Sequence, residues 1–233
     1  MQNPVADPLD PALSTNGACP VDTVSQTCFR CIAEGVREQG YVVLPHALPQ
    51  PLADALWVQA HESPSANFRP AAIGRLEQRD RNRFVRTDEI AWIEGQTIAT
   101  RQWLQWSEQL RLQLNRALLL GLFSFESHFA HYAPGAFYRR HFDAFKGETN
   151  RVLSLVAYLN HDWAPDDGGE LVIYRESTGG GEPLRVTPAF GTLVAFLSED
   201  FPHEVLPARR DRYSIAGWYR VNNSVAERVD PPR

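Results

Sequence analysis

Hydrophobic positions in the first half of the chain follow a helical pattern. In three separate segments before about residue 122 they recur every three to four residues, which is the period of an amphipathic helix, and a polar region from about residue 61 to 83 lies between the second and third segments. This spacing predicts a helix that begins near Thr23 and stops at Gly40, a second helix that Pro51 opens, and a long helix over residues 98–120. A short buried strand is predicted at residues 41–44. The first part of the chain is therefore expected to form a helical and irregular support.

From Phe123 onward the pattern changes to short β-rich segments that are separated by turn residues. Predicted strands lie near residues 124–133, 137–143, 151–159, 170–175, 184–187, 191–197, 203–207 and 212–220. The turns are marked by Pro134-Gly135, Asp166-Asp167-Gly168-Gly169, Gly179-Gly180-Gly181 and Ala208-Arg209-Arg210-Asp211. Eight short strands at this spacing predict a mainly β fold with supporting α-helices, a sandwich or jelly roll, and not a parallel α/β sheet.

The chain is predicted to form one domain between two tails. Residues 1–22 are rich in Pro, Ala, Asp and Ser without periodicity, which is typical of a flexible tail. Residues 23–122 would form a helical support and residues 123–221 the β core, followed by a C-terminal tail at 222–233.

Composition and charge narrow the class of protein. The chain has 233 residues, of which 43% are hydrophobic and 22% charged, as in an ordinary soluble globular protein. Its formal net charge of −5 argues against a dedicated nucleic-acid binder. No apolar run is long enough to span a bilayer and the N-terminus lacks the pattern of a signal peptide, so a cytoplasmic protein without a membrane partner is expected.

Three cysteines, Cys19, Cys28 and Cys31, are too few and too closely spaced to suggest a disulfide framework. Cys28 and Cys31 form a C-x-x-C, which could be a redox pair or, with Cys19, half a zinc site. No second C-x-x-C and no paired histidines follow at zinc spacing. The favoured interpretation is that these are small apolar residues on and beside the buried stripe of the first helix.

Candidate chemistry begins at His141 and Asp143. Because they are two residues apart, both side chains would point to the same face of a β-strand. One more imidazole from a distant strand would complete two histidines and one carboxylate on one side of a metal, the facial triad of non-haem Fe(II) oxygenases. His203, which opens a later β segment, supplies that imidazole. His131 and His161 lack a carboxylate two residues on along a strand and are predicted to be surface or hydrogen-bonding residues.

Arg212 opens the next β segment nine residues after His203. A hairpin through residues 208–211 would bring the two side chains onto neighbouring strands. An arginine that points into a barrel is costly to bury without an anion, and the distal carboxylate of 2-oxoglutarate is such an anion. Arg212 could bind it through a bidentate pair, with a hydroxyl donor from Tyr158. Three protein ligands and two cosubstrate ligands leave one metal position for O2.

Several further stretches, together with the triad, resemble one family. They are Arg86-x-Asp88 with Trp92-Ile93-Glu94-Gly95, Tyr132 and Pro134-Gly135 before Tyr138-x-x-His141-x-Asp143, Arg151 with Tyr158-Leu159-Asn160-x-Asp162-Trp163, Gly168-Gly169-x-Leu171, and Pro202-His203-Glu204-Val205 with Arg212-Tyr213 and Trp218-Tyr219. Over about residues 41–219 the chain resembles the Fe(II)/2-oxoglutarate prolyl 4-hydroxylases, specifically the oxygen-sensing type that modifies hypoxia-inducible factor and its bacterial relatives. That family has a double-stranded β-helix, a cupin-like jelly roll.

The resemblance implies a role for each matched residue. The iron ligands would be His141, Asp143 and His203. Arg212 and Tyr158 would hold the far carboxylate of 2-oxoglutarate and Tyr132 would lie near its chelating end, with Leu171 and Trp218 lining the pocket. Arg86, Asp88 and Arg151 match substrate-facing positions, where Asp88 could pair with Arg151 or contact the substrate backbone. Residues 144–150 and the segment before Arg86 differ from the animal pattern, so the peptide preference of the animal enzymes is not carried over.

The function that the resemblance implies is hydroxylation of a prolyl residue in a protein to 4-hydroxyproline. Fe(II) would be the cofactor, 2-oxoglutarate and O2 would be consumed with release of succinate and CO2, and ascorbate is a further candidate cofactor. Bacterial members of the group make a proline of translation elongation factor Tu a candidate target.

Three alternatives stay open. An oxygenase on the same core could demethylate nucleic acid through the arginines of residues 75–86, or could act on a small molecule. The negative net charge and the lack of interleaved aromatic residues disfavour nucleic acid as a partner. A jelly-roll binding module that had lost its chemistry would be expected to have a degenerate triad, whereas this triad is complete. Asp143 stands where halide-using relatives need a small residue, so hydroxylation is favoured over halogenation.

Overall fold

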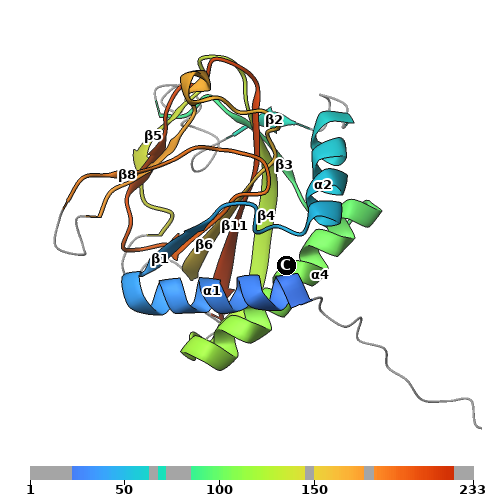
Figure 1. The fold of residues 1–233 in the computed structure, drawn as a ribbon, viewed down its shortest axis with the longest axis vertical. Coiled ribbons are helices and arrows are strands. Elements are labelled where there is room, and N and C mark those ends of the chain that lie inside the picture. Colours follow the sequence, from blue (N-terminus) through green and yellow to red (C-terminus); the bar gives the residue numbers. More distant parts are fainter. Residues whose placement is uncertain (1–22, 63–67, 72–84, 145–149, 176–180, 223–233) are drawn as a thin grey trace, which may run out of the picture.

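A computed structural model describes residues 23–62, 68–71, 85–144, 150–175 and 181–222 (Figure 1). The predicted tail at residues 1–22, which includes Cys19, lies outside the described residues. Three other predicted features also lie outside the described residues. They are the C-terminal tail from residue 223 onward, the arginines at positions 75–83, and the part of the triple-glycine turn that ends at residue 180. No described helix is long and apolar enough to cross a membrane.

The three predicted helices are confirmed. They are α1 (Thr23–Gln39), α2 (Gln50–Glu62) and α4 (Ile98–Leu118), and a short 3-10 helix, η3 (Pro165–Asp167), lies in a later loop. Helix α4 begins where the Thr97 and Thr100 side chains cap each other's backbone amides. It ends two residues earlier than predicted, because Leu119 adopts a left-handed conformation with φ of 56°.

All eight predicted strands of the second half are present, in two antiparallel sheets. The strands are β1 (Tyr41–Leu44), β2 (Arg69–Pro70), β3 (Glu89–Trp92), β4 (Leu122–Tyr132), β5 (Tyr138–His141), β6 (Arg151–Tyr158), β7 (Leu171–Ile173), β8 (Leu184–Val186), β9 (Leu193–Leu197), β10 (His203–Val205) and β11 (Arg212–Val221). The larger sheet has the order β1-β9-β6-β11-β4-β3-β2 and the smaller one β5-β10-β7-β8. This is the mainly β, jelly-roll type of fold that the strand spacing predicts.

Three details of the edge strands differ from the prediction. Strand β1 is half-buried instead of buried, because it lies at the edge of the larger sheet. Strands β2 and β3, at the opposite edge, are not predicted by the pattern. Both are short, and β3 has no clear alternation between buried and exposed positions.

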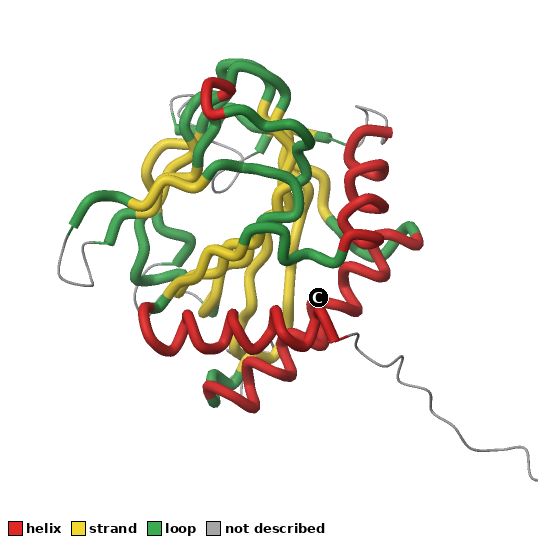
Figure 2. The backbone as a smooth tube through the Cα atoms, viewed as in Figure 1, coloured by secondary structure: helices red, strands yellow, loops and turns green. Residues whose placement is uncertain are grey.

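The larger sheet separates two hydrophobic cores. Figures 1 and 2 show α1 and α4 crossing beside β1, β6, β11 and β4, with α2 beside them. Alternate residues of β9 face the two sides: Leu193 and Ala195 pack in the core that holds the helices, while Val194 and Phe196 pack in the core of the barrel between the sheets. The helices thus support one face of the sheet and leave the other face free to form a cavity.

Side chains of α4 and α1 show how these helices pack. Trp103 is fully buried and its indole nitrogen donates to the Ser127 hydroxyl of β4 at 3.0 Å, so α4 lies across the larger sheet. Cys28 is buried and Cys31 half-buried, and both are free thiols. Burial, helped by the neighbouring Cys31, raises the pKa of Cys28 to about 12. Cys28 is therefore a protonated apolar residue of the α1 stripe and not a reactive thiolate.

Candidate metal centre and cosubstrate pocket

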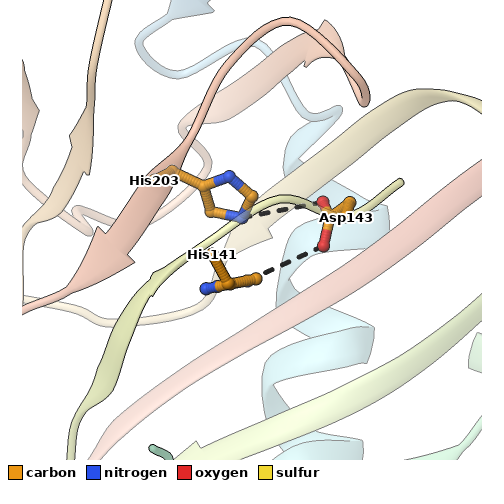
Figure 3. A group of neighbouring side chains, drawn as sticks. All are labelled: His141, Asp143 and His203. Carbon is orange, nitrogen blue, oxygen red and sulfur yellow. Dashed lines mark ion pairs between the residues drawn. The ribbon is translucent and has the colours of Figure 1, made fainter. Parts of the chain in front are cut away.

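His141, Asp143 and His203 converge on one point inside the barrel. One ligand atom from each lies within 4.8 Å of the other two, a spacing that could hold a metal ion. Asp143 Oδ1 is 3.7 Å from His141 Nε2, and Asp143 Oδ2 is 3.6 Å from His203 Nε2. Figure 3 shows both contacts as dashed lines and the imidazole of His203 turned toward the carboxylate. Two histidines and one carboxylate is the donor set of a non-haem iron site.

Hydrogen bonds to the backbone orient both imidazoles. His141 Nδ1 lies 2.8 Å from the Arg139 carbonyl oxygen, and His203 Nδ1 lies 3.0 Å from that of Phe201. A carbonyl oxygen can only accept, so each Nδ1 carries the proton and each Nε2 presents its lone pair to the shared point. This is the tautomer that a metal ligand needs.

Burial and charge set the protonation state of the cluster. Burial, together with the neighbouring His203, lowers the pKa of His141 to about 3, so its imidazole is neutral at physiological pH. Burial alone would raise the pKa of Asp143, but the two imidazoles and the Ser154 hydroxyl outweigh it and lower that pKa. The Ser154 hydroxyl donates to Asp143 Oδ2 at 2.6 Å. The cluster therefore offers the neutral imidazole of His141 and the anion of Asp143, beside the Nε2 lone pair of His203.

The predicted reason for this convergence is wrong in one respect. His141 is the last residue of β5, and Asp143 lies beyond the end of the strand. Their side chains meet because the chain turns after His141, not because both belong to one face of a regular strand. The pairing of β5 with β10 then places His203 directly opposite His141.

Arg212 is a buried cation on the other wall of the same cavity. Its side chain lies between the rings of Tyr132 and Tyr158, with the guanidinium carbon 4.8 Å and 5.1 Å from the two ring centres. Its Nε donates to the Gly169 carbonyl oxygen at 2.8 Å and its Nη1 to the Ser214 hydroxyl at 3.2 Å. Among the described residues no carboxylate forms an ion pair with Arg212, although only 1% of the residue is exposed.

The expected hairpin between His203 and Arg212 does not exist. β10 belongs to the smaller sheet and β11 to the larger one, where it pairs with β4 and β6. The segment between them crosses from one sheet to the other, as the two-sheet topology requires. The two residues thus face one cavity from opposite sheets instead of from neighbouring strands.

A cavity of about 260 Å³ joins the two groups of side chains. Its wall contains every predicted site residue except Asp88, including Leu171 and Trp218, which were expected to line it. The triad and Arg212 thus share one small chamber, which suits a small dicarboxylate better than a large ligand.

Comparisons with known proteins place this geometry in a family. A sequence model described as "2OG-Fe(II) oxygenase superfamily" matches residues 127–220, the part that supplies the triad and Arg212. A crystal structure of a Pseudomonas putida prolyl-4-hydroxylase is 40% identical, with a TM-score of 0.75, and the match covers 83% of this chain and 98% of that one. The chain belongs to the 2OG-Fe(II) oxygenase superfamily.

Two further relatives of this oxygenase are animal proteins. The mouse Egl nine homolog 1 is 32% identical over 155 residues, which cover 61% of this chain and 37% of the mouse protein. The chain therefore spans only about a third of the length of that curated relative. A Trichoplax adhaerens prolyl hydroxylase, solved in complex with a peptide of hypoxia inducible factor, is 25% identical, with a TM-score of 0.71 over 84% of this chain and 90% of that one.

Fe(II), 2-oxoglutarate and O2 are the cofactor and cosubstrates of this superfamily, and the oxygenase has side chains that fit them. The triad offers the donors for iron. On the opposite wall the Tyr158 hydroxyl is buried and has no hydrogen-bond partner within the described part of the chain; it lies close to the Arg212 cation but outside hydrogen-bond geometry with it. Burial, opposed by Arg212, raises the pKa of Tyr158 to about 12, so the hydroxyl keeps a proton to donate. A carboxylate bound there would satisfy both groups.

The residues predicted to face the substrate form other pairs than expected. Arg86 donates to both carboxylate oxygens of Asp88, at 2.7 Å and 2.5 Å. Arg151 donates twice to Glu126, at 3.0 Å and 2.7 Å, and lies over the Trp218 ring at 3.8 Å. Asp88 is buried behind Arg86, so its position does not suit a contact with substrate, whereas both arginines line the cavity.

Two cavity residues, His128 and Ser154, have no predicted role. A signal for them exists in the sequence, because residues at even spacing on a strand share a face. Counting back by four from Tyr132 on β4 reaches His128, and counting back by four from Tyr158 on β6 reaches Ser154. The imidazole of His128 lies between the rings of Trp92 and Trp218, with centroids 5.2 Å and 5.4 Å away.

His128 is expected to make the oxygenase less stable in acid. Burial, with a smaller effect from the Arg86 cation, lowers the pKa of His128 to about 4. An unfolded histidine binds its proton near pH 6.5, so the unfolded state takes up more protons between about pH 6.5 and 4 and stability falls across that window. The loss could reach roughly 3 kcal/mol by pH 4. Urea unfolding of wild type and His128→Leu at several pH values measures it; equal slopes in both proteins would contradict the expectation.

The other two histidines that were considered as ligands, His131 and His161, lie outside the cavity wall. His131 Nε2 lies 2.7 Å from Asp211 Oδ1, and its ring is stacked on that of Tyr213. The His161 ring is stacked on Phe190 at 3.7 Å between centroids, in the turn after β6. Neither is part of a cluster that could hold a metal among the described residues.

Proposed function

We propose that this oxygenase is an Fe(II)- and 2-oxoglutarate-dependent prolyl 4-hydroxylase that acts on a protein. The observation that carries the proposal is the cavity, with the His141, Asp143 and His203 triad on one side and, on the other, the buried Arg212, which pairs with no carboxylate of the described residues. The similarity to the Pseudomonas putida prolyl-4-hydroxylase supports the choice of a prolyl substrate.

The residues of the chain would divide the work as follows. The three triad side chains hold the metal, and Arg212 with Tyr158 hold the far carboxylate of 2-oxoglutarate through a charge-assisted pair and a hydroxyl donor. When bound, iron and 2-oxoglutarate supply the oxidising chemistry that an unactivated C–H bond requires. The apolar wall of Leu171 and Trp218 excludes water from the chamber, which strengthens these polar contacts.

The mouth of the cavity suits an apolar substrate group. Trp92 and Phe142 both contribute to the cavity wall and are 47% and 41% exposed. Arg86 and Arg151 lie in the same wall, but Asp88 and Glu126 neutralise them. Exposed aromatic faces beside neutralised cations favour the ring of a proline over a charged or phosphorylated group.

The identity of the protein substrate is a finer proposal. Elongation factor Tu is a candidate by the resemblance of the sequence to bacterial prolyl hydroxylases. Comparing the intact mass of the factor from cells with and without this oxygenase tests it, and equal masses would remove the candidate. A role in oxygen sensing is a further proposal, which the O2 concentration at half-maximal turnover tests. A requirement for ascorbate is another, which is tested by adding ascorbate to the purified enzyme and measuring turnover.

The activity is tested by succinate release. Wild-type protein incubated with Fe(II), 2-oxoglutarate, O2 and a proline-containing protein substrate is expected to release succinate and add one oxygen atom to the substrate. His141→Ala should release at least about 100-fold less succinate. Losing a residue that only hydrogen-bonds to a metal ligand typically lowers activity about 10–100-fold, and losing the ligand itself should cost more. His161→Ala, a histidine outside the cavity, is the matched control. Equal turnover by wild type and His141→Ala would show that the proposal is wrong.

A further inference from the structure

Strand β5 contains an irregularity beside the metal centre. His141 pairs with His203 while Tyr138 pairs with Val205, so three steps along β5 oppose two steps along β10. In a regular strand, residues three apart point to opposite faces. The extra residue turns Tyr138 and His141 to the same side, where both line the cavity, and leaves the two arginines between them exposed.

The irregularity brings the rings of Tyr138 and His141 into a stack. Their centroids are 3.5 Å apart and their planes differ by 11°. The Arg86 guanidinium carbon lies 4.2 Å from the centre of the same Tyr138 ring. A parallel imidazole at 3.5 Å covers one face of the phenol ring, so the guanidinium occupies the other face. The order of the stack is therefore Arg86, Tyr138, His141.

The outer end of the stack is fixed in place. Both hydrogen bonds of Arg86 go to Asp88, whose side chain is fully buried. The backbone beside Arg86 is also tied to β5, through bonds from Arg139 N to the Val85 oxygen at 2.7 Å and from Thr87 N to the Phe137 oxygen at 3.0 Å. The guanidinium therefore cannot slide away from Tyr138 without breaking a buried ion pair, which is costly.

His141 needs such support more than His203 does. The His203 side chain is 7% exposed and packs edge-on against the Phe196 ring at 4.7 Å. The His141 side chain is 14% exposed, and its polar tie is a hydrogen bond to a carbonyl of its own strand. That bond sets the rotation of the imidazole, but it does not prevent the ring from tilting out of its plane. The flat face of Tyr138 at 3.5 Å does prevent it.

We propose that Tyr138, held by the Arg86–Asp88 pair, is a positioning residue that fixes the imidazole plane of His141 for metal binding. The inference rests on the proposed role of His141 as an iron ligand. It gives Arg86 and Asp88 a function on the metal side of the cavity, in addition to any contact that Arg86 makes with substrate.

The test is Co(II) binding to the metal-free protein, followed by calorimetry and by the visible ligand-field absorption of Co(II), neither of which requires turnover. Tyr138→Leu is expected to weaken Co(II) binding about 10-fold and to shift the absorption bands, because the imidazole is free to tilt. Tyr138→Phe keeps the ring and should stay within about 3-fold of wild type with unshifted bands. Arg86→Gln should fall between them.

Arg140→Gln is the matched control. Arg140 is on the same strand and lies over an aromatic ring at 4.0 Å, but that ring belongs to Tyr174, outside the cavity. Its Co(II) affinity should equal that of wild type. Wild-type binding by Tyr138→Leu, or an equal loss in Tyr138→Phe, would overturn the inference. If Tyr138→Leu does not unfold cooperatively, Arg86→Gln decides, and wild-type affinity and bands there would overturn it.

His141→Ala separates this inference from the proposed function. If it binds Co(II) as tightly as wild type, the metal assignment itself is wrong. If it loses Co(II) while Tyr138→Leu does not, only the positioning role of Tyr138 fails.

Discussion

Replacing Asp143 with asparagine is expected to reduce succinate release at least about 100-fold. The substitution keeps the size of the side chain but removes the anion of the metal centre, leaving only the two imidazoles to hold a divalent cation. The bond from the Ser154 hydroxyl to Oδ2 helps to aim that carboxylate between the two Nε2 atoms. Anaerobic titration with Fe(II) should show the same loss as turnover does, because the defect lies in metal binding.

Asp162→Asn is the control for this substitution. Asp162 also follows a histidine, but it is exposed, lies in the turn after β6, and has a φ of 51°, which asparagine tolerates. It should leave turnover and Fe(II) affinity unchanged. Wild-type Fe(II) affinity in Asp143→Asn would mean that the carboxylate is not a ligand.

Replacing Arg212 with methionine is expected to weaken 2-oxoglutarate binding at least about 30-fold, which corresponds to about 2 kcal/mol for the loss of one partner of a buried charge pair. The stability of the ligand-free protein should behave differently. Because Arg212 is buried with no carboxylate partner among the described residues, its removal relieves a desolvation cost that offsets the two lost hydrogen bonds. The free energy of unfolding should therefore stay within about 1 kcal/mol of wild type.

Thermal unfolding under anaerobic conditions, with and without 2-oxoglutarate and Mn(II), measures both effects. Saturating 2-oxoglutarate should raise the Tm of wild type and leave that of Arg212→Met nearly unchanged, since stabilisation by a ligand follows its affinity. Arg210→Met, which removes an exposed arginine two residues away, is the control. An equal rise in Tm for wild type and Arg212→Met would exclude Arg212 as the anion partner.

Regular periodicity explains the parts of the fold and site that the sequence predicts. The eight strands follow from a repeat of two residues, and the three helices from a repeat of three to four. Arg212 begins the long strand β11, where it pairs with Tyr132 of β4. The same alternation would also have identified His128 and Ser154. A resemblance of motifs supplied the roles, which the alternation alone does not give.

The irregular parts could not be predicted, because they depend on contacts distant in sequence. In the pairing of β5 with β10, three residue steps along β5 lie opposite two along β10. This irregularity arises only when the two strands meet, and no local sequence pattern predicts it. The crossing of the chain between the sheets after His203 depends on which partners β11 finds, here β4 and β6. Asp88 pairs with Arg86 and not with Arg151 because Glu126, on β4, already takes that arginine.

The two cores on either side of the larger sheet carry an evolutionary consequence. In β6, Leu153 and Ala157 pack in the core that holds the helices, whereas Ser154, Val156 and Tyr158 line the chamber. A lineage can therefore substitute chamber-facing positions and change what the enzyme accepts, while the scaffold-facing positions drift under a separate requirement for packing. The alternation of a single strand thus lets selection for a new substrate and selection for a stable fold act on different residues.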